Sequence, residues 1–505
     1  MVDGQGDQTR DVRPADFISQ PKKLVLSLPA MPSKTKRSRV KPVKTQTAPA
    51  TPLFSEPIFG EGGKVLPDPK GFLQPHPSDN ATYAKIEALL DTQTCSFNAS
   101  TVADGEVFSL ADAFGPQGPA VVAAVQKQGQ IVFHCAGDTG ASAAGNYSNE
   151  VHVFDVVAAD FQARSVPNQA AFFYHLGDII YNFGEAKYYY DQFYEPLRNY
   201  PRPVFAIPGN HDSFILPNTP AGSDPLAIYS RNFCAPEVDV SPDAGSLHRT
   251  ALTQPGVYWT LDAPFVRIIG LFSNALEDPG VISSEGGTWK NVPDLQLAYL
   301  TAQLTRIKQE NYLGAVLLAV HHLPFCYAAP SSGGGGGQHQ SSTAMLRDID
   351  TICQQVGVYP HAVLSGHSHN YQRFTRTIQL AKGTSYQVPF VVCGCGGHAV
   401  LPLVQNDYKH QHDPKQGANV SYLEQNPAVT SLGLTLDHFD DYNYGYLRVT
   451  VNAQQLIIQF NPTTSLGGLG VDTVTVDLAT HQVLTPAGKS SRRTARPTKA
   501  KGKHR

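Results

Sequence analysis

The stretch IVFHCAGDTG, residues 131–140, decides the fold of this 505-residue chain. Its apolar run is typical of a buried strand, and the glycine that follows allows a sharp turn. The carboxylate of Asp138 is then placed just beyond the strand end. A single Gly-Asp pair is common in ordinary turns, so the segment becomes informative only because related segments recur along the chain.

Four further segments repeat this arrangement, in which an apolar run precedes side chains that can bind a metal. They are GDIIY (177–181), GNHD (209–212), HHLP (321–324) and GHSH (366–369). The preceding runs predict strands at 170–176, 203–207, 315–320 and 361–364, and helices are predicted at 185–195, 293–309 and 344–355. Alternation of strand, loop and helix places functional loops along one edge of a sheet.

The side chains of the five segments form a mixed set of oxygen and nitrogen donors. Carboxylates, one amide, one phenol and several imidazoles suit Fe, Zn or Mn, and they are numerous enough for two ions. Two neighbouring metals are a device for phosphoester hydrolysis. The phenol of Tyr181, three residues after Asp178, suits Fe(III) better than Zn, although a tyrosine near a strand end can also be ordinary packing.

The GNHD segment combines three different chemical groups. Asn210 offers a neutral carbonyl ligand, His211 offers a donor to a phosphate or leaving oxygen, and Asp212 could orient that imidazole. The alternative interpretation is a turn centred on the asparagine, with no chemical role.

The histidine pairs differ in geometry. His367 and His369 are two residues apart and face the same side of an extended strand end, so both could reach neighbouring metals. His321 and His322 are adjacent and would point in opposite directions, so only one is expected to be a ligand. The remaining histidines have no such context and are expected to be packed or exposed: His134, His152, His175, His398, His410 and His412.

Charge is unevenly distributed. Six basic residues lie between Lys34 and Lys44 and eight between Lys489 and Arg505, and removing them from the net charge of −3 leaves −17. Basic ends could bind nucleic acid, polyphosphate or an anionic membrane, or could merely be solvated. The acidic body argues against nucleic-acid binding as the main activity.

Four regions are expected from composition and periodicity. Residues 1–60 form a disordered or loosely draped segment, 61–124 an extension packing on the core, 125–484 the catalytic domain and 485–505 a disordered basic tail. No apolar run approaches the ~20 residues of a membrane span. The start of the chain lacks a signal-peptide pattern, which indicates a cytoplasmic protein, or a secreted or periplasmic one whose signal was removed. Seven cysteines are an odd number, so at least one thiol should be free in a monomer, and the others could be buried thiols or form one or two disulfides.

The five ordered segments resemble the calcineurin-like metallophosphoesterases, and the tyrosine of GDIIY resembles the purple acid phosphatases among them. That family shows GDxG, GDxxY, GNH(D/E), VxxH and GHxH, and four of these match fully here. The fourth departs. A proline often lies two residues after the ligand in relatives, which favours His322 as the ligand and keeps His321 in reserve. The implied fold is a four-layer α/β/β/α sandwich, with two mixed sheets flanked by helices.

The resemblance also implies a ligand set. A first metal, expected to be Fe(III), would be held by Asp138, Asp178, Tyr181 and His369. A second, divalent metal (Fe, Zn or Mn) would be held by Asn210, His322 and His367, with Asp178 bridging. His211 would be the catalytic group. Asn210, His211 and, more weakly, His339 would contact substrate, although the glycine-rich loop 331–339 could simply be a flexible cover.

The implied activity is a dinuclear-metal acid phosphatase, which hydrolyses phosphate monoesters by attack of a metal-activated hydroxide. Its partners would be small phosphorylated molecules. A phosphodiesterase of the same superfamily would use the same metal core. A non-enzymatic metal- or phosphate-binding protein is disfavoured because every ligand type is present. The natural substrate and the oligomeric state stay open.

Overall fold

The computed structural model describes residues 107–484, apart from 215–223, 246, 248, 277–278, 291, 327–338, 340, 402, 404–431 and 464–469. Both basic ends and most of the glycine-rich loop lie outside the described residues. Within the described part, no helix is both long and apolar enough to cross a membrane. The six cysteines described there are all free thiols.

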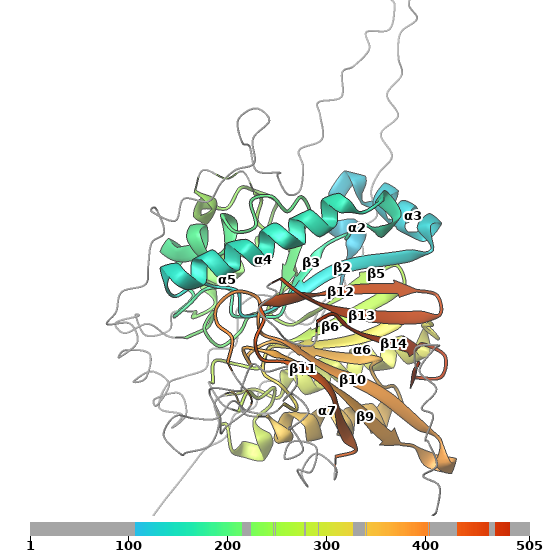
Figure 1. The fold of residues 1–505 in the computed structure, drawn as a ribbon. Helices are drawn as coiled ribbons and strands as arrows, with labels where there is room; N and C mark the ends of the chain where they lie inside the picture. The colour runs from blue at the N-terminus through green and yellow to red at the C-terminus, as the bar shows by residue number, and fades with distance from the viewer. Residues whose placement is uncertain are drawn as a thin grey trace, which may run out of the picture. The chain divides into compact units, whose positions relative to one another are not determined.

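Two mixed sheets form the centre of the fold (Figure 1). The first has the order β1 (Val107–Ser109), β5 (Trp259–Ala263), β6 (Val266–Leu271), β7 (Ala315–Val320), β8 (Ala362–Ser365), β10 (Ser385–Cys393), β9 (Tyr371–Gln379) and β11 (Leu434–Asp440). The second has the order β15 (Gln482–Val483), β14 (Asp472–Asp477), β13 (Gln455–Pro462), β12 (Gly445–Asn452), β2 (Gln130–Ala136), β3 (Phe173–His175) and β4 (Val204–Ala206). Strands β6, β7, β8 and β10 run parallel, as do β2, β3 and β4.

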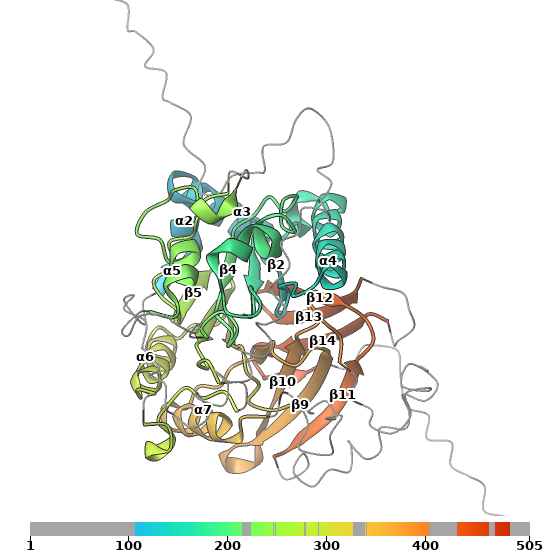
Figure 2. The same cartoon turned by 90° about the vertical axis from the view of Figure 1, so that its left-hand side faces the viewer.

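Helices flank the two sheets. They are α2 (Leu110–Ala113), α3 (Gly118–Gln128), α4 (Ala144–Ala163), α5 (Ala227–Phe233), α6 (Leu295–Gln309) and α7 (Thr343–Val356). Figure 2 shows α4 on one side and α6 with α7 on the other, with strands between them. This arrangement confirms the expected fold class of two mixed sheets flanked by helices. Strand β1 pairs with β5, so residues 107–109 belong to the first sheet.

Aromatic side chains from both sheets meet in the core. The ring of Trp259 on β5 lies 6.1 Å from that of Tyr174 on β3 and 5.7 Å from that of Phe205 on β4. All three are fully buried, and each such ring removes roughly 150–250 Å² from water. Because the sheets are joined by this packed layer, their strand ends are held in fixed positions relative to one another.

The expected strands form where the apolar runs lie, and β7 has the predicted bounds. The expected α-helix at 185–195 is wrong, because this segment forms a 3₁₀ turn at Ala186–Tyr188 and a wider π turn at Tyr190–Tyr194. The π turn brings the Gln192 amide onto the backbone of Tyr181, accepting from its N–H at 2.8 Å and donating to its carbonyl at 2.9 Å. Single π turns often occur at functional sites, and this one holds the backbone of a candidate metal ligand.

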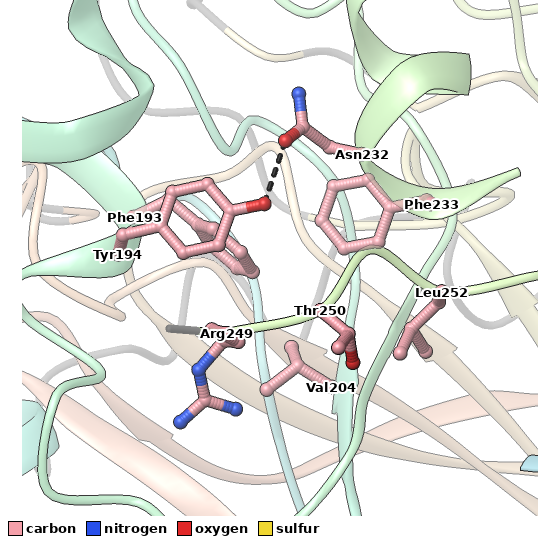
Figure 3. Close-up of a pocket in the computed structure, with 8 residues that line it drawn as sticks. All are labelled: Phe193, Tyr194, Val204, Asn232, Phe233, Arg249, Thr250 and Leu252. Atoms are coloured by element: carbon pink, nitrogen blue, oxygen red, sulfur yellow. Dashed lines mark hydrogen bonds between the residues drawn. The ribbon is translucent and has the colours of Figure 1, made fainter. Parts of the chain in front are cut away.

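A small cavity beside β4 and α5 is separate from the candidate ligands. It is lined by Phe193, Tyr194, Val204, Asn232, Phe233, Arg249, Thr250 and Leu252 (Figure 3). The buried Arg249 guanidinium donates to the carbonyls of Leu197, Tyr200 and Arg202. Its hydrogen bonds satisfy the backbone of the chain that enters β4, and they indicate a structural role.

Candidate metal centre

The ligand-bearing segments follow the carboxyl ends of strands in both sheets. Asp138, Asp178 and Asn210 come after β2, β3 and β4, while His321 and His367 come after β7 and β8. Because the strands in each group are parallel, their carboxyl ends lie along one edge of the sheet. The two sheets therefore contribute opposite halves of one site.

Three of these residues have a left-handed backbone that side-chain-bearing residues rarely adopt. The φ angles are 56° at Asp138, 55° at Asp178 and 63° at His367. Such conformations cost roughly 1–3 kcal/mol each and cluster at functional sites. Close packing adds a further constraint, since a Cβ atom at Gly209 would collide with Oδ1 of Asp178. The loops are shaped to present side chains, at some cost in stability.

Four of the expected ligands form one group around the phenol of Tyr181. The phenol oxygen lies 2.9 Å from Oδ2 of Asp178, 3.4 Å from Oδ1 of Asp138 and 3.3 Å from Nε2 of His369. The last two atoms are themselves 3.4 Å apart. This group contains all the residues expected to hold the first metal.

A second group lies on the other side of Asp178. Nε2 of His321 is 3.0 Å from Oδ1 of Asn210 and 3.3 Å from Oδ2 of Asp178. Asp178, His321 and His367 each present a ligand atom within 4.8 Å of the others, and all three are buried. Asp178 is therefore common to both groups, which is the position of a bridging carboxylate.

The expectation for His322 requires a correction. Nδ1 of His322 lies 2.7 Å from Oγ of Ser273, and Nε2 lies 2.6 Å from the carbonyl oxygen of Leu276. Because a carbonyl only accepts, Nε2 carries the proton and Nδ1 accepts from the serine hydroxyl. Nε2 of His322 thus faces a backbone carbonyl. Nδ1 of His321, the reserve, contacts the Leu176 carbonyl, and its Nε2 faces Asn210 and Asp178, the place expected for His322.

Buried carboxylates give the site an electrostatic preference for bound positive charge. Burial raises the pKa of Asp138, although the neighbouring histidines His369 and His321 partly offset it. Burial also acts to raise the pKa of Asp178, but the charges of His321 and His211 hold it well below its usual value. Burial would lower the pKa of His321, yet Asp178 raises it to about 9. A proton on His321 thus balances Asp178, and metal binding would displace that proton.

The donor set fits two cations. Buried carboxylate, phenol, amide and imidazole donors match hard or borderline ions such as Fe, Zn and Mn. Asp138, Tyr181 and His369 can hold one ion, Asn210, His321 and His367 a second, and Asp178 both.

His211 lies beside this centre and is held by its surroundings. Its Nδ1 donates to the Asn182 carbonyl at 3.0 Å, and its backbone N–H donates to Oδ1 of Asp178 at 3.0 Å. Burial lowers the pKa of His211 to about 4. Because Nδ1 is used for the carbonyl, Nε2 is the nitrogen that can exchange a proton with a substrate.

Asp212 does not orient the His211 imidazole, contrary to the expectation. Its carboxylate accepts the backbone N–H groups of Gly209, Ile179 and Ile180 at 2.9–3.2 Å. Burial, with the nearby charge of Asp178, raises the pKa of Asp212 to about 7. Its role is to join the GDIIY loop to the GNHD loop, and the Asn182 carbonyl orients His211 instead.

Two further histidines adjoin the site. The buried ring of His339, a weak candidate from sequence, lies 4.6 Å from the His367 ring and 4.7 Å from the His369 ring. His398 was expected to be an ordinary histidine, but its ring is stacked on Tyr181. The available signal was its place after β10 and two glycines, since a strand end followed by glycine precedes several other site residues.

The two-sheet α/β domain thus gathers side chains that could bind metal at its strand ends. Residues 131–371, which include all five ligand-bearing segments, match the model described as calcineurin-like phosphoesterase. Proteins of this family use a dinuclear metal centre, which agrees with the two groups of donors described above. The comparison with curated proteins gives no match.

Several solved structures are similar. A purple acid phosphatase, PPD1, from yellow lupin (Lupinus luteus) seeds is 16% identical, with a TM-score of 0.43, over 68% of this chain and 53% of that chain. PhoD is 14% identical, with a TM-score of 0.42, and the match covers 70% of this chain and 72% of PhoD. GAP50, the anchor in the inner membrane complex of Plasmodium, is 10% identical, with a TM-score of 0.41, and the match covers 68% of this chain and 88% of GAP50. The chain therefore spans about half the length of the lupin protein.

Proposed function

We propose that this chain is a dinuclear-metal phosphatase that hydrolyses phosphate monoesters. The observation that carries the proposal is the position of Asp178, whose Oδ2 lies 2.9 Å from the Tyr181 phenol and 3.3 Å from Nε2 of His321. One carboxylate between two donor groups is suited to hold two cations a few ångströms apart, the arrangement used to clamp attacking and leaving oxygens.

The two donor groups favour different metals. Asp138, Asp178 and Tyr181 supply anionic oxygen, which suits Fe(III), with His369 as the nitrogen ligand. Asn210, His321 and His367 supply neutral donors, which suit a divalent Fe, Zn or Mn ion. When bound, the cations would neutralise phosphate charge and lower the pKa of a water molecule.

The chain's own residues complete the chemistry. Hydrolysis forms a bond from water oxygen to phosphorus and breaks the ester bond, so the departing oxygen needs a proton. His211 can supply it when Nε2 is protonated, which its pKa of about 4 confines to acidic pH, while the Asn182 carbonyl holds Nδ1. His339, whose ring lies against those of His367 and His369, would contact the phosphate. Natural substrates are small phosphorylated molecules in this proposal.

Substrate preference distinguishes a monoesterase from a diesterase. The protein should hydrolyse p-nitrophenyl phosphate with a higher kcat/KM than bis-p-nitrophenyl phosphate, because the doubly charged monoester gains more from two cations. Steady-state kinetics on both compounds across acidic and neutral pH measure this ratio. If the diester gives the higher kcat/KM, the activity is that of a phosphodiesterase on the same metal core.

The adjacent histidines provide a matched pair for testing the second metal group. His321→Ala should lose the ion held with Asn210 and most activity. His322→Ala should keep both ions and be less stable, because Ser273 and the Leu276 carbonyl lose a buried partner, which costs roughly 1–3 kcal/mol. Elemental analysis and thermal unfolding of both variants measure these effects. Loss of metal from His322→Ala alone would reverse the ligand assignment.

Tyr181 tests the identity of the first metal. A phenolate bound to Fe(III) absorbs visible light, so the purified protein should be coloured, and Tyr181→Phe should lose the band. The phenylalanine keeps the ring and removes only the oxygen near Asp178 and His369. A visible spectrum with iron analysis is the measurement. A colourless, iron-free but active protein would point instead to a Zn or Mn phosphoesterase.

A further inference from the structure

The imidazole of His398 is stacked on the ring of Tyr181. The ring centroids are 3.6 Å apart and the planes differ by only 11°. The His369 ring lies 5.0 Å from His398 in an edge-to-face arrangement. His398 thus contacts the phenol ring whose oxygen lies among the candidate ligands of the first metal.

His398 is fixed to the loop that carries Asp138. Its Nδ1 donates to the Gly140 carbonyl at 2.7 Å, and its backbone N–H donates to the Asp138 carbonyl at 3.0 Å. The neighbouring Gly396 N–H donates to the Gly137 carbonyl at 3.1 Å. The segment after β10 therefore moves with the GDTG loop, and the His398 ring is held at a defined tilt.

The backbone of Tyr181 is held separately. The Gln192 amide bonds both its N–H and its carbonyl, but these contacts leave the side-chain torsions open. The phenol oxygen is bonded to Asp178, and the ring contacts His211 at 4.1 Å with a tilt of 39° and His398 at 3.6 Å in a nearly parallel arrangement. The His398 ring is the closer of the two, and it limits how far the phenol can swing.

We propose that His398 is a positioning residue, which clamps the Tyr181 ring so that its oxygen stays directed at the first metal. This inference rests on the proposed role of Tyr181 as an iron ligand. Outer residues that orient a ligand typically change metal affinity by 10–100-fold when removed. The ring contact with His398 adds to the restraint from His211, and the hydrogen bond from Nδ1 holds the His398 ring at its tilt.

Three substitutions separate the two contacts. His398→Ala removes both, His398→Phe keeps a ring without the donor, and His398→Asn keeps an amide donor without the ring. His152→Ala is the matched control, because His152 is exposed and bonds the Thr463 carbonyl. Visible absorption, iron content and the rate of iron loss to a chelator are measured on each folded protein, with thermal unfolding recorded in parallel.

The expected result is iron loss about 10–100-fold faster in His398→Ala, with a shifted and weakened visible band. His398→Phe should recover most of both properties, and His398→Asn little of either. The clamp is refuted if His398→Ala matches His152→Ala, or if His398→Asn recovers the properties and His398→Phe does not. A wild-type protein without the band overturns the iron–Tyr181 assignment and the clamp together, whereas an unchanged band in His398→Ala overturns the clamp alone.

Discussion

Asp178→Asn is expected to lose both metal ions and essentially all activity. The carboxylate of Asp178 accepts hydrogen bonds from the Tyr181 phenol and the His211 backbone N–H, and it lies 3.3 Å from Nε2 of His321. An amide of the same size keeps the shape but removes the negative charge that both cations would share. Without it, each ion keeps fewer anionic ligands, and the buried imidazoles cannot compensate because they are neutral when they bind metal.

The measurement is metal stoichiometry beside kcat for p-nitrophenyl phosphate. Asp239→Asn is the matched control, because Asp239 is exposed and its carboxylate bonds the N–H of the next residue, Val240. The control should keep two ions and full activity. If Asp178→Asn retained two ions with wild-type kcat, Asp178 would not bridge the site.

His211→Ala is expected to lower kcat about 100-fold while keeping both ions and the visible band. The size is typical of removing a general acid or an anion-stabilising donor. In the structure the His211 ring is bonded to the Asn182 carbonyl, and its centroid lies 4.1 Å from that of the Tyr181 ring, at a tilt of 39°. The two donor groups are formed by other residues. The substitution should therefore lower the rate of the chemical step and leave the number of bound ions unchanged.

Kinetics and elemental analysis on the same preparations separate these two roles. His152→Ala again provides a histidine control away from the strand-end loops. Metal loss in His211→Ala would make the residue a ligand or a support for one. An unchanged kcat with intact metal content would leave it without a part in catalysis.

Much of the fold could be predicted because local patterns and global structure agree. The strands β2, β3, β4, β7 and β8 are visible in the sequence as short apolar runs. A glycine and a polar side chain follow four of them, and β7 leads directly into His321. The segment 185–195 was harder. Its aromatics have helical spacing, but the Gln192 side chain bonds the distant Tyr181 backbone and the segment adopts a wider turn.

The errors at the site have the same physical origin. Choosing between His321 and His322 requires knowledge of which side of β7 faces Asn210 and which faces Ser273, and both partners come from distant parts of the chain. Asp212 was assigned to its neighbour His211, but its partners include amides some thirty residues earlier. Contacts between loops of different strands decide these roles, and spacing along one loop does not.

The most direct test of the two-metal account is the metal content of the purified wild-type protein, measured beside its activity before and after metal removal. The account predicts two ions per chain, with at least one iron, loss of phosphatase activity when they are removed and its return only when both positions are refilled. Full activity in metal-free protein, or full activity with a single ion per chain, would contradict it.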